Sequence, residues 1–164
     1  MQPTPDMRVG DGLARLLVFR LGAERFAVAL AEVHEVIDAP ETRPLPDAPP
    51  PIVGVATIGG ELVTMYDSHA LLSAGGRVPD ARPTAALLFE RHGGDSRRVG
   101  VLVDDVYDAM TVDPTELRPI PGANASDGLL VGLVRRGSDL VVVLDAEILL
   151  ASASMTARRE ERSA

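Results

Sequence analysis

The sequence contains no cysteine, no lysine and no tryptophan among its 164 residues. Without cysteine there is no disulfide framework, no thiolate metal ligand and no thiol nucleophile. Without lysine there is no phosphate-loop lysine and no Schiff-base chemistry. No run approaches the roughly 18 apolar residues that cross a bilayer, and the polar start does not resemble a secretory signal. These absences predict a cytoplasmic protein without direct membrane insertion.

Aromatic and positive residues are also scarce. The chain has three Phe and two Tyr, and its 16 basic residues, all arginine, face 24 acidic ones, for a net charge of −8. Such a composition provides neither a basic groove nor stacking platforms, which argues against nucleic-acid binding. The hydrophobic content of 46% and charged content of 24% are those of a globular domain with a genuine core.

An internal repeat is the most informative feature present. The stretch ELVTMYDSHALL, residues 61–72, recurs 78 positions later as DLVVVLDAEILL, residues 139–150. RFAVALAEVHEVI, from Arg25, recurs 73 positions later as RRVGVLVDDVYDAM, where Arg98 aligns with Arg25. Each copy is too short to bury its own apolar face easily, so the repeat predicts two similar lobes that share an apolar core.

Short apolar runs punctuated by turns predict mostly β structure. Residues 15–21 and 25–30 form one predicted hairpin, and 53–58 and 61–67 form a second across Gly-Gly. Residues 31–37 are expected to begin with a helical turn and continue extended. SHALL follows Asp67 as a short helix, with the aspartate as its N-cap.

The predicted fold is all-β: two tandem five-stranded barrels on a shared apolar core, with a short helix after each half, because barrel closure removes exposed strand edges. We expect a disordered arm over 1–14, one domain over 15–150 and a polar tail over 151–164. The expected lobes are about 15–82 and 83–150.

The candidates for catalysis are weak. Asp67, Ser68 and His69 are adjacent, whereas triad members converge from separate segments, so capping is favoured. A small hydrolase using His34, Asp67 and His69 stays open as an alternative if these side chains meet in a pocket. The acidic run VDDVYD lacks the spacing and glycine of a calcium loop. We therefore expect no enzyme activity, no metal and no cofactor.

Four segments in order resemble the CheW family of bacterial chemosensory coupling proteins. They are FRLGAERFAVALAEVHEVI, PLPDAPPPIVGVATIGGELVTMYD, RRVGVLVDDVYDAM and GLVRRGSDLVVVLDAEILL, and they span nearly the whole chain. The resemblance implies two SH3-like barrels and a non-enzymatic adaptor. It also implies two partners: the cytoplasmic tip of a chemoreceptor and the regulatory domain of a CheA-type histidine kinase, in receptor arrays.

In the family, receptor contact falls in a groove between the barrels. Carried over by position, one wall of this groove would hold Val33, Glu35, Val36 and Ile58, with Gly59 in the adjoining turn. The opposite wall would hold Val101 and Val103. The alternative for these valines is burial in the core. The resemblance assigns no kinase-binding residues.

The chain departs from the family pattern at three places. TIGG stands where the family usually has N-L-R-G, so Gly59 replaces an arginine. Thr64 replaces a proline, and Ser68 and His69 replace the L-R of D-L-R. A divergent accessory protein that binds receptor with altered or lost kinase coupling is therefore the alternative within this class.

Overall fold

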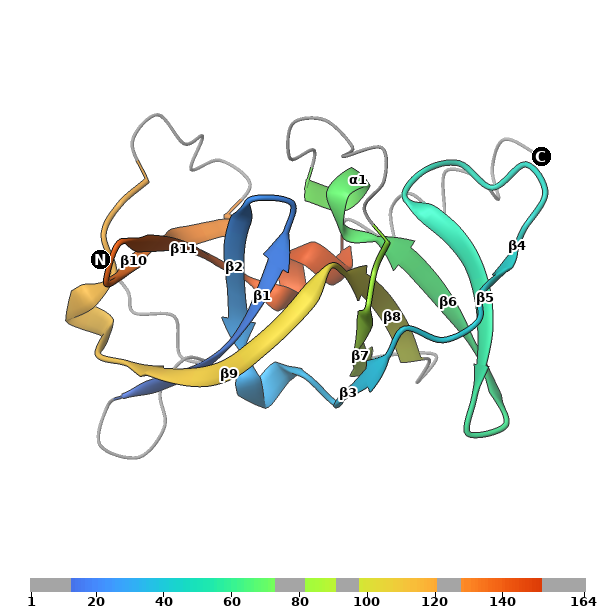
Figure 1. Cartoon of the computed structure of the whole chain (residues 1–164), viewed down its shortest axis with the longest axis horizontal. Coiled ribbons are helices and arrows are strands. Elements are labelled where there is room, and N and C mark those ends of the chain that lie inside the picture. Colours follow the sequence, from blue (N-terminus) through green and yellow to red (C-terminus); the bar gives the residue numbers. More distant parts are fainter. Residues whose placement is uncertain (1–12, 73–81, 91–97, 121–127, 152–164) are drawn as a thin grey trace. The chain divides into compact units, whose positions relative to one another are not determined.

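The computed structural model describes residues 13–72, 82–90, 98–120 and 128–151. The chain forms two compact units, each built around one β-sheet (Figure 1). Unit 1 comprises Met1–Glu32 and Val106–Leu149, and unit 2 comprises Val33–Asp105 and Leu150–Ala164. The predicted all-β class with two barrel-like parts is confirmed, although neither sheet closes into a complete barrel.

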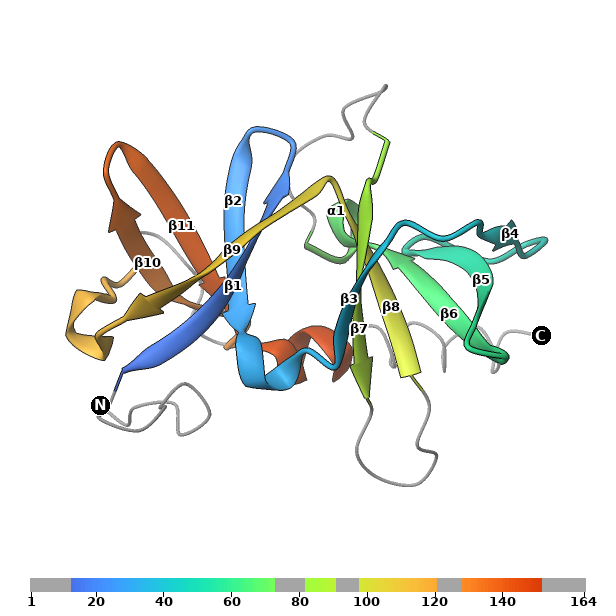
Figure 2. The same ribbon diagram turned by 60° about the horizontal axis from the view of Figure 1, so that its bottom comes forward.

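Unit 1 holds a five-stranded sheet in the order β10-β11-β2-β1-β9. Figure 2 shows the long strand β9 lying along β1. Two short 3-10 helices belong to this unit: η2 follows β2, and η3 follows β9. The bounds are β1 (Ala14–Leu21), β2 (Glu24–Ala29), η2 (Leu30–Glu32), β9 (Asp105–Val112), η3 (Pro114–Glu116), β10 (Leu130–Arg136) and β11 (Asp139–Leu144).

Unit 2 holds a six-stranded sheet in the order β3-β7-β8-β6-β5-β4. Its one helix, α1, follows β6. The bounds are β3 (Glu35–Asp38), β4 (Arg43–Pro44), β5 (Ile52–Ile58), β6 (Glu61–Asp67), α1 (Ser68–Leu72), β7 (Ala85–Glu90) and β8 (Arg98–Val103).

The units do not coincide with the sequence halves predicted as lobes, 15–82 and 83–150. Each unit combines the first hairpin of one half with the second hairpin of the other: β1–β2 with β10–β11, and β7–β8 with β5–β6. The chain changes unit after Glu32, after Asp105 and after Leu149, and the first two of these positions are 73 residues apart. The repeat is therefore present in the fold, with its parts exchanged between units.

The strand register confirms the repeat residue by residue. In unit 1, Val142 of β11 lies beside Phe26 of β2 in a parallel pair. In unit 2, Thr64 of β6 lies beside Val99 of β8 in the equivalent parallel pair. Thr64 precedes Val142 by the 78-residue offset, and Phe26 precedes Val99 by the 73-residue offset. The parallel pairs of the two units are therefore equivalent under the two offsets found in the sequence.

An Arg-Pro segment pairs antiparallel with the first strand of β5–β6 and of β10–β11, next to a glycine. Arg43 pairs with Val55 beside Gly54, and Arg118 pairs with Leu133 beside Gly132. A Cβ added to Gly54 would lie 2.1 Å from the carbonyl oxygen of Arg43, and one added to Gly132 would lie 3.0 Å from that of Arg118. These glycines permit the close backbone approach.

Each unit has its own hydrophobic cluster. In unit 1 it includes Leu16, Val18 and Val134, and in unit 2 it includes Val63, Met65 and Leu88. Both clusters are built from strand positions that alternate with more exposed ones, as in β6, where Val63 is buried between the exposed Leu62 and the half-buried Thr64. Each cluster thus combines residues of both sequence halves, and a core shared between the two units stays a prediction.

The local elements follow the sequence closely. The two predicted hairpins form as β1–β2 and β5–β6, and residues 31–37 contain the end of η2 followed by β3. Short helices occupy 68–72 and 146–151, after the second hairpin of each half. Most of the predicted arm, 1–14, and of the predicted tail, 151–164, lies outside the described residues.

Candidate partner-binding site

Strand β3 forms one edge of the unit 2 sheet and carries the predicted site residues Glu35 and Val36. It pairs only with β7, where Glu35 lies beside Leu88 and Val36 beside Leu87. Glu35 is exposed, and Val36 is 41% exposed, which is high for a valine on a strand. Val33, just before the strand, is half-buried. This edge therefore offers an apolar and an acidic side chain to solvent.

Ile58 and Gly59 lie at the end of β5. Ile58 is half-buried and packs against the unit 2 cluster, as does Ile37 of β3, although three strands separate β3 and β5 in the sheet. The sheet is therefore curved enough to bring both ends onto one cluster. Gly59 and Gly60 have φ of 58° and 83°, so the two-residue turn needs the left-handed backbone that glycine adopts without strain.

Val101 and Val103 do not contribute to a binding surface. They are 1% and 0% exposed in β8, a strand with neighbours on both sides. Five of its six residues are buried, as is expected when both faces of a strand are covered. The predicted second wall of the groove is therefore wrong for these two valines, and the core alternative holds.

The charge of Glu35 has no counterpart within the described part of unit 2. The basic groups at this end of the sheet, His34 and Arg98, both approach Glu90, at 3.3 and 3.9 Å. No described side chain forms an ion pair or hydrogen bond with the Glu35 carboxylate. Since Gly59 has no side chain, it does not supply the cation that an arginine would at that position.

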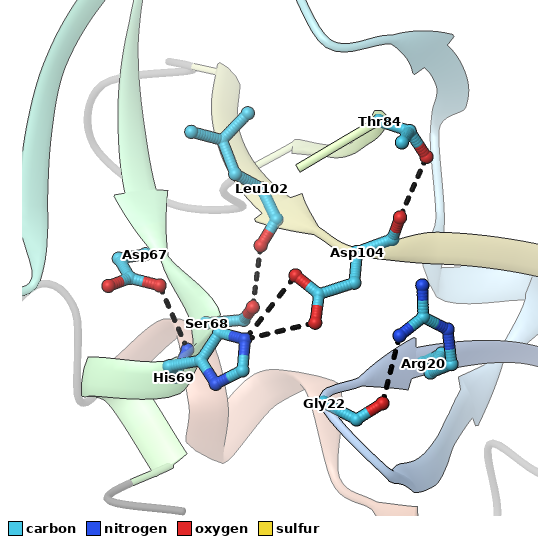
Figure 3. A network of polar contacts seen from close by, with 8 residues as sticks. All are labelled: Arg20, Gly22, Asp67, Ser68, His69, Thr84, Leu102 and Asp104. Carbon is cyan, nitrogen blue, oxygen red and sulfur yellow. Dashed lines mark hydrogen bonds and ion pairs between the residues drawn. The ribbon is translucent and has the colours of Figure 1, made fainter. Parts of the chain in front are cut away.

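The replaced residues Ser68 and His69 point into unit 2 (Figure 3). The Ser68 hydroxyl, 2% exposed, donates to the carbonyl oxygen of Leu102. His69 Nε2 lies 3.2 Å from Oδ2 of Asp104, whose side chain is only 6% exposed. Thr84 donates its hydroxyl to the backbone oxygen of Asp104. These contacts fix the end of β8, so the two residues serve the fold of unit 2.

Figure 3 also draws Asp67, whose carboxylate oxygen accepts the backbone N–H of His69 at 3.1 Å. This is the predicted N-cap. His34 is paired with Glu90 instead, and His69 with Asp104, so the three groups of the hydrolase alternative do not assemble. In the same figure Arg20 of unit 1 donates to the carbonyl oxygen of Gly22 within the β1–β2 turn.

No described group of three or more His, Asp or Glu residues has the geometry of a metal site. Among the described residues, no helix is long and apolar enough to span a membrane.

Two carboxylates of unit 1 have perturbed acidity. The pKa of Asp113 is lowered chiefly by the hydrogen bond from the backbone N–H of Thr115, because Asp113 caps η3. The pKa of Glu116 is lowered chiefly by its hydrogen bond with Arg136. Glu116 also accepts the backbone N–H of Asp113, so the two residues form a reciprocal capping box. This cluster stabilises η3 and lies in the unit that holds none of the predicted site residues.

Two exposed leucines were not predicted as surface features. Leu62 is 76% exposed and Leu140 is 53% exposed, and they are equivalent under the 78-residue offset. Each is the second residue of the strand that follows a two-residue glycine-containing turn. The signal available in sequence was the alternation in which Val63 and Val141 face inward, which places their preceding neighbours outward.

The model of the CheW-like domain family matches residues 15–154. Chemotaxis protein CheW of Rhizobium meliloti is 32% identical over 111 residues, covering 68% of this chain and 69% of the relative. Chemotaxis protein CheW of Klebsiella aerogenes is 26% identical over 141 residues, covering 85% and 82%. The crystal structure of the scaffolding protein TtCheW from Thermoanaerobacter tengcongensis superposes with a TM-score of 0.68 at 20% identity, covering 82% of this chain and 90% of that one.

The fold and the family match define an all-β protein of the CheW-like type. The chain belongs to the CheW-like domain family, as the resemblance of its four segments predicted.

Proposed function

We propose that this protein is a non-enzymatic chemosensory adaptor that couples the cytoplasmic tips of chemoreceptors to the regulatory domain of a CheA-type histidine kinase. The match to the CheW-like domain family over residues 15–154 carries the proposal. The place of action that follows is the cytoplasmic face of receptor arrays. A receptor-contact face at Val33, Glu35, Val36, Ile58 and Gly59 is consistent with the exposed edge formed by β3.

The accessory alternative, with altered kinase coupling, rests on the departures from the family pattern. Ser68 is buried and bonded inside unit 2, so its replacement does not change a partner-facing surface. Thr64 is half-buried between Val55 and Val99 in the sheet. Gly59 is the exposed departure, which concentrates any change of partner choice at the β5–β6 turn. We therefore favour the full coupling role.

The test is reconstitution of a ternary complex. The purified protein, a receptor cytoplasmic fragment and a CheA-type kinase from the same cell are co-sedimented, and kinase activity is measured in the assembly. We expect both partners to co-sediment and kinase activity to rise when all three are present. Recovery of the receptor fragment alone, with no kinase, would favour the accessory alternative, and recovery of neither would reject the proposal.

Val36→Asp tests the contact face in the same assay. Because Val36 is 41% exposed, we expect the fold to survive and receptor affinity to fall about tenfold or more from burial of an unpaired charge. Ala109→Asp is the matched control, since Ala109 is exposed on β9 and equivalent to Val36 under the 73-residue offset. Equal effects of the two substitutions would remove β3 from the receptor-contact face.

A further inference from the structure

The central hairpin of the unit 1 sheet comes from a separate stretch of chain. β1 and β2 lie between β11 on one side and β9 on the other, so the sheet without this hairpin would be two disconnected pieces. The hydrophobic cluster of the unit is divided in the same way, between residues of the hairpin and residues of β9–β11: Ala14, Leu16, Val18 and Ala27 against Val112, Val134, Val141 and Val143. Neither piece therefore has a complete core by itself.

The hairpin is joined to the next strand of the chain, β3, through η2. This 3-10 helix has three residues, none of them buried. Beyond it, the backbone N–H of His34 donates to the carbonyl oxygen of Leu88 at 2.8 Å, which fixes the chain to unit 2. A single 3-10 turn has poor hydrogen-bond geometry and little stability of its own. The segment between β2 and His34 is therefore the weakest connection of the hairpin.

The repeat contains an extended version of the same segment. Residues 30–32, which form η2, are equivalent to residues 103–105 under the 73-residue offset. There β8 ends at Val103 and β9 begins at Asp105, so a single residue separates the two strands. Flanking strands like those of η2 are therefore compatible with an extended connection. Extension of three residues from a 3-10 helix to a strand lengthens the connection by about 4 Å.

We propose that η2 is a hinge through which two copies of this chain exchange their β1–β2 hairpins. With η2 extended, the hairpin of one copy lies between β9 and β11 of the other, and each unit 1 sheet contains strands of both chains. Every strand pairing of the sheet is formed again in such a domain-swapped dimer, so exchange loses only the turn at η2. Unit 2 stays within one chain, because all six of its strands follow the hinge. The inference is independent of the proposed function.

The dimer should form only when the protein is concentrated during folding. Exchange replaces a pairing within one chain, whose effective concentration is on the order of millimolar, by a pairing between two chains. Opening a finished sheet would expose the hydrophobic cluster of unit 1, including Leu16 and Val18, to water. Exchange therefore takes place during refolding, and a dimer once formed reverts slowly.

The first test is refolding of the full chain from urea at about 1 mM and at about 1 µM. Size-exclusion chromatography with light scattering should show a dimer after the concentrated refolding only, and this dimer should persist on dilution. A monomer under both conditions would overturn the inference.

The hinge itself is tested by one substitution. Ala31→Val, at an exposed position of η2, should raise the dimer fraction about twofold or more, because β-branched residues favour extended backbone. Ala109→Val is the matched control, since Ala109 is also exposed but already lies in a strand, β9. It should leave the dimer fraction unchanged. Equal dimer fractions in the two variants would show that η2 is not the hinge.

Engineered cysteines identify the exchanged strands, because the chain has no cysteine of its own. Ala27 of β2 lies beside Val143 of β11 in the parallel pair, and adjacent strands about 4.8 Å apart permit a disulfide. Ala27→Cys and Val143→Cys are placed in separate chains, one of which carries a size tag. The two chains are refolded together with reductant at about 1 mM and then oxidised. We expect a disulfide that joins one chain of each kind.

The control uses the parallel pair of unit 2. Thr64 lies beside Val99, and both residues follow the hinge, so separate chains with Thr64→Cys and Val99→Cys should not become linked. Phe26→Cys with Val142→Cys, the next pair in the unit 1 register, repeats the test independently. Melting curves of the reduced variants show that each one folds. A dimer without either unit 1 link, or with equal linking in unit 2, would overturn the inference and leave the proposed function standing.

Discussion

Gly54 and Gly132 occupy equivalent positions in the two units, but the backbone segment that pairs beside each glycine lies at a different distance from it. The close approach at Gly54 is 2.1 Å to the Arg43 carbonyl oxygen, measured from an added Cβ, against 3.0 Å at Gly132. At Gly54 the three nearest atoms all belong to the backbone of Arg43 and Pro44, whereas at Gly132 two of the three belong to the side chain of Leu117, which moves more readily. The same glycine-to-alanine change is therefore expected to have unequal consequences in the two copies of the repeat.

Gly54→Ala should lower the free energy of unfolding by about 3 kcal/mol, whereas Gly132→Ala should cost about 1 kcal/mol, because only the former requires Arg43 to leave its pairing with β5. Thermal melting of both variants checks this, and the difference corresponds to roughly 4 to 8 °C in Tm. Similar losses of stability in the two variants would contradict the account of the Arg-Pro crossings.

At the scale of elements, the contact between α1 and the end of β8 depends on a buried histidine–carboxylate pair. His69 and Asp104 have side chains 14% and 6% exposed, while the comparable pair of His34 and Glu90 has side chains 34% and 48% exposed. The two pairs have nearly the same distance, 3.2 and 3.3 Å. The difference in burial alone should set their value, since solvent screens the exposed pair.

His69→Leu should destabilise the protein by about 2 kcal/mol or more, because a buried carboxylate loses a hydrogen-bond partner. His34→Leu should cost less than about 1 kcal/mol. Urea denaturation of both variants at one pH gives the comparison. If His34→Leu proved the more damaging change, burial would not be the deciding quantity.

The capping box of η3 makes this element sensitive to acid. The lowered pKa values of Asp113 and Glu116 mean that the unfolded chain takes up protons before the folded one as the pH falls. Their contribution to stability is therefore complete above the ordinary values of 3.8 and 4.5 and is lost as the pH drops through the lowered folded values. The protection factor of the Leu117 amide, which donates to Pro114, should fall over that range. Asp113→Asn keeps a good N-cap without the titrating carboxylate. In this variant the Leu117 amide should therefore respond less to acid.

How far the sequence predicted the structure depends on the range of each contact. Hairpins, the α1 cap at Asp67 and the helical turn before β3 follow from neighbouring residues, and all were predicted. The burial of Val101 and Val103 was only one of two alternatives, because β8 is apolar on both faces and alternation cannot tell which side is exposed. Asp104 was also missed as a buried group, since its partner His69 lies 35 residues away and the acidic run around it suggested solvent.

At the scale of the whole molecule, the repeat could not predict that each unit combines hairpins from both sequence halves. A repeat shows which segments are alike, whereas the parallel pairs β2–β11 and β6–β8 decide which segments are neighbours. Each of these pairs joins strands of different halves. Loop closure over such separations leaves no local pattern in the sequence. The predicted domain, 15–150, thus holds two units whose limits only the strand pairing reveals.

Fragments of similar length should therefore differ in folding. Residues 1–82 include β1–β2 without β9–β11 and β3–β6 without β7–β8, so both sheets are incomplete. Residues 33–105 contain all six strands of the unit 2 sheet. We expect the 33–105 fragment to show cooperative unfolding below the Tm of the whole chain, and the 1–82 fragment to show none. Circular dichroism melts of both fragments decide this. Cooperative melting of 1–82 at the temperature of the whole protein would also refute the predicted shared core.

The order in which the strands are synthesised differs from the order in which their sheets can be completed. The β1–β2 hairpin leaves the ribosome first, but its neighbours β9 and β11 are synthesised last, after Asp105. All six strands of unit 2 emerge in one uninterrupted stretch between these two events. The amino-terminal hairpin must therefore wait through the synthesis of a complete sheet before its own can be finished.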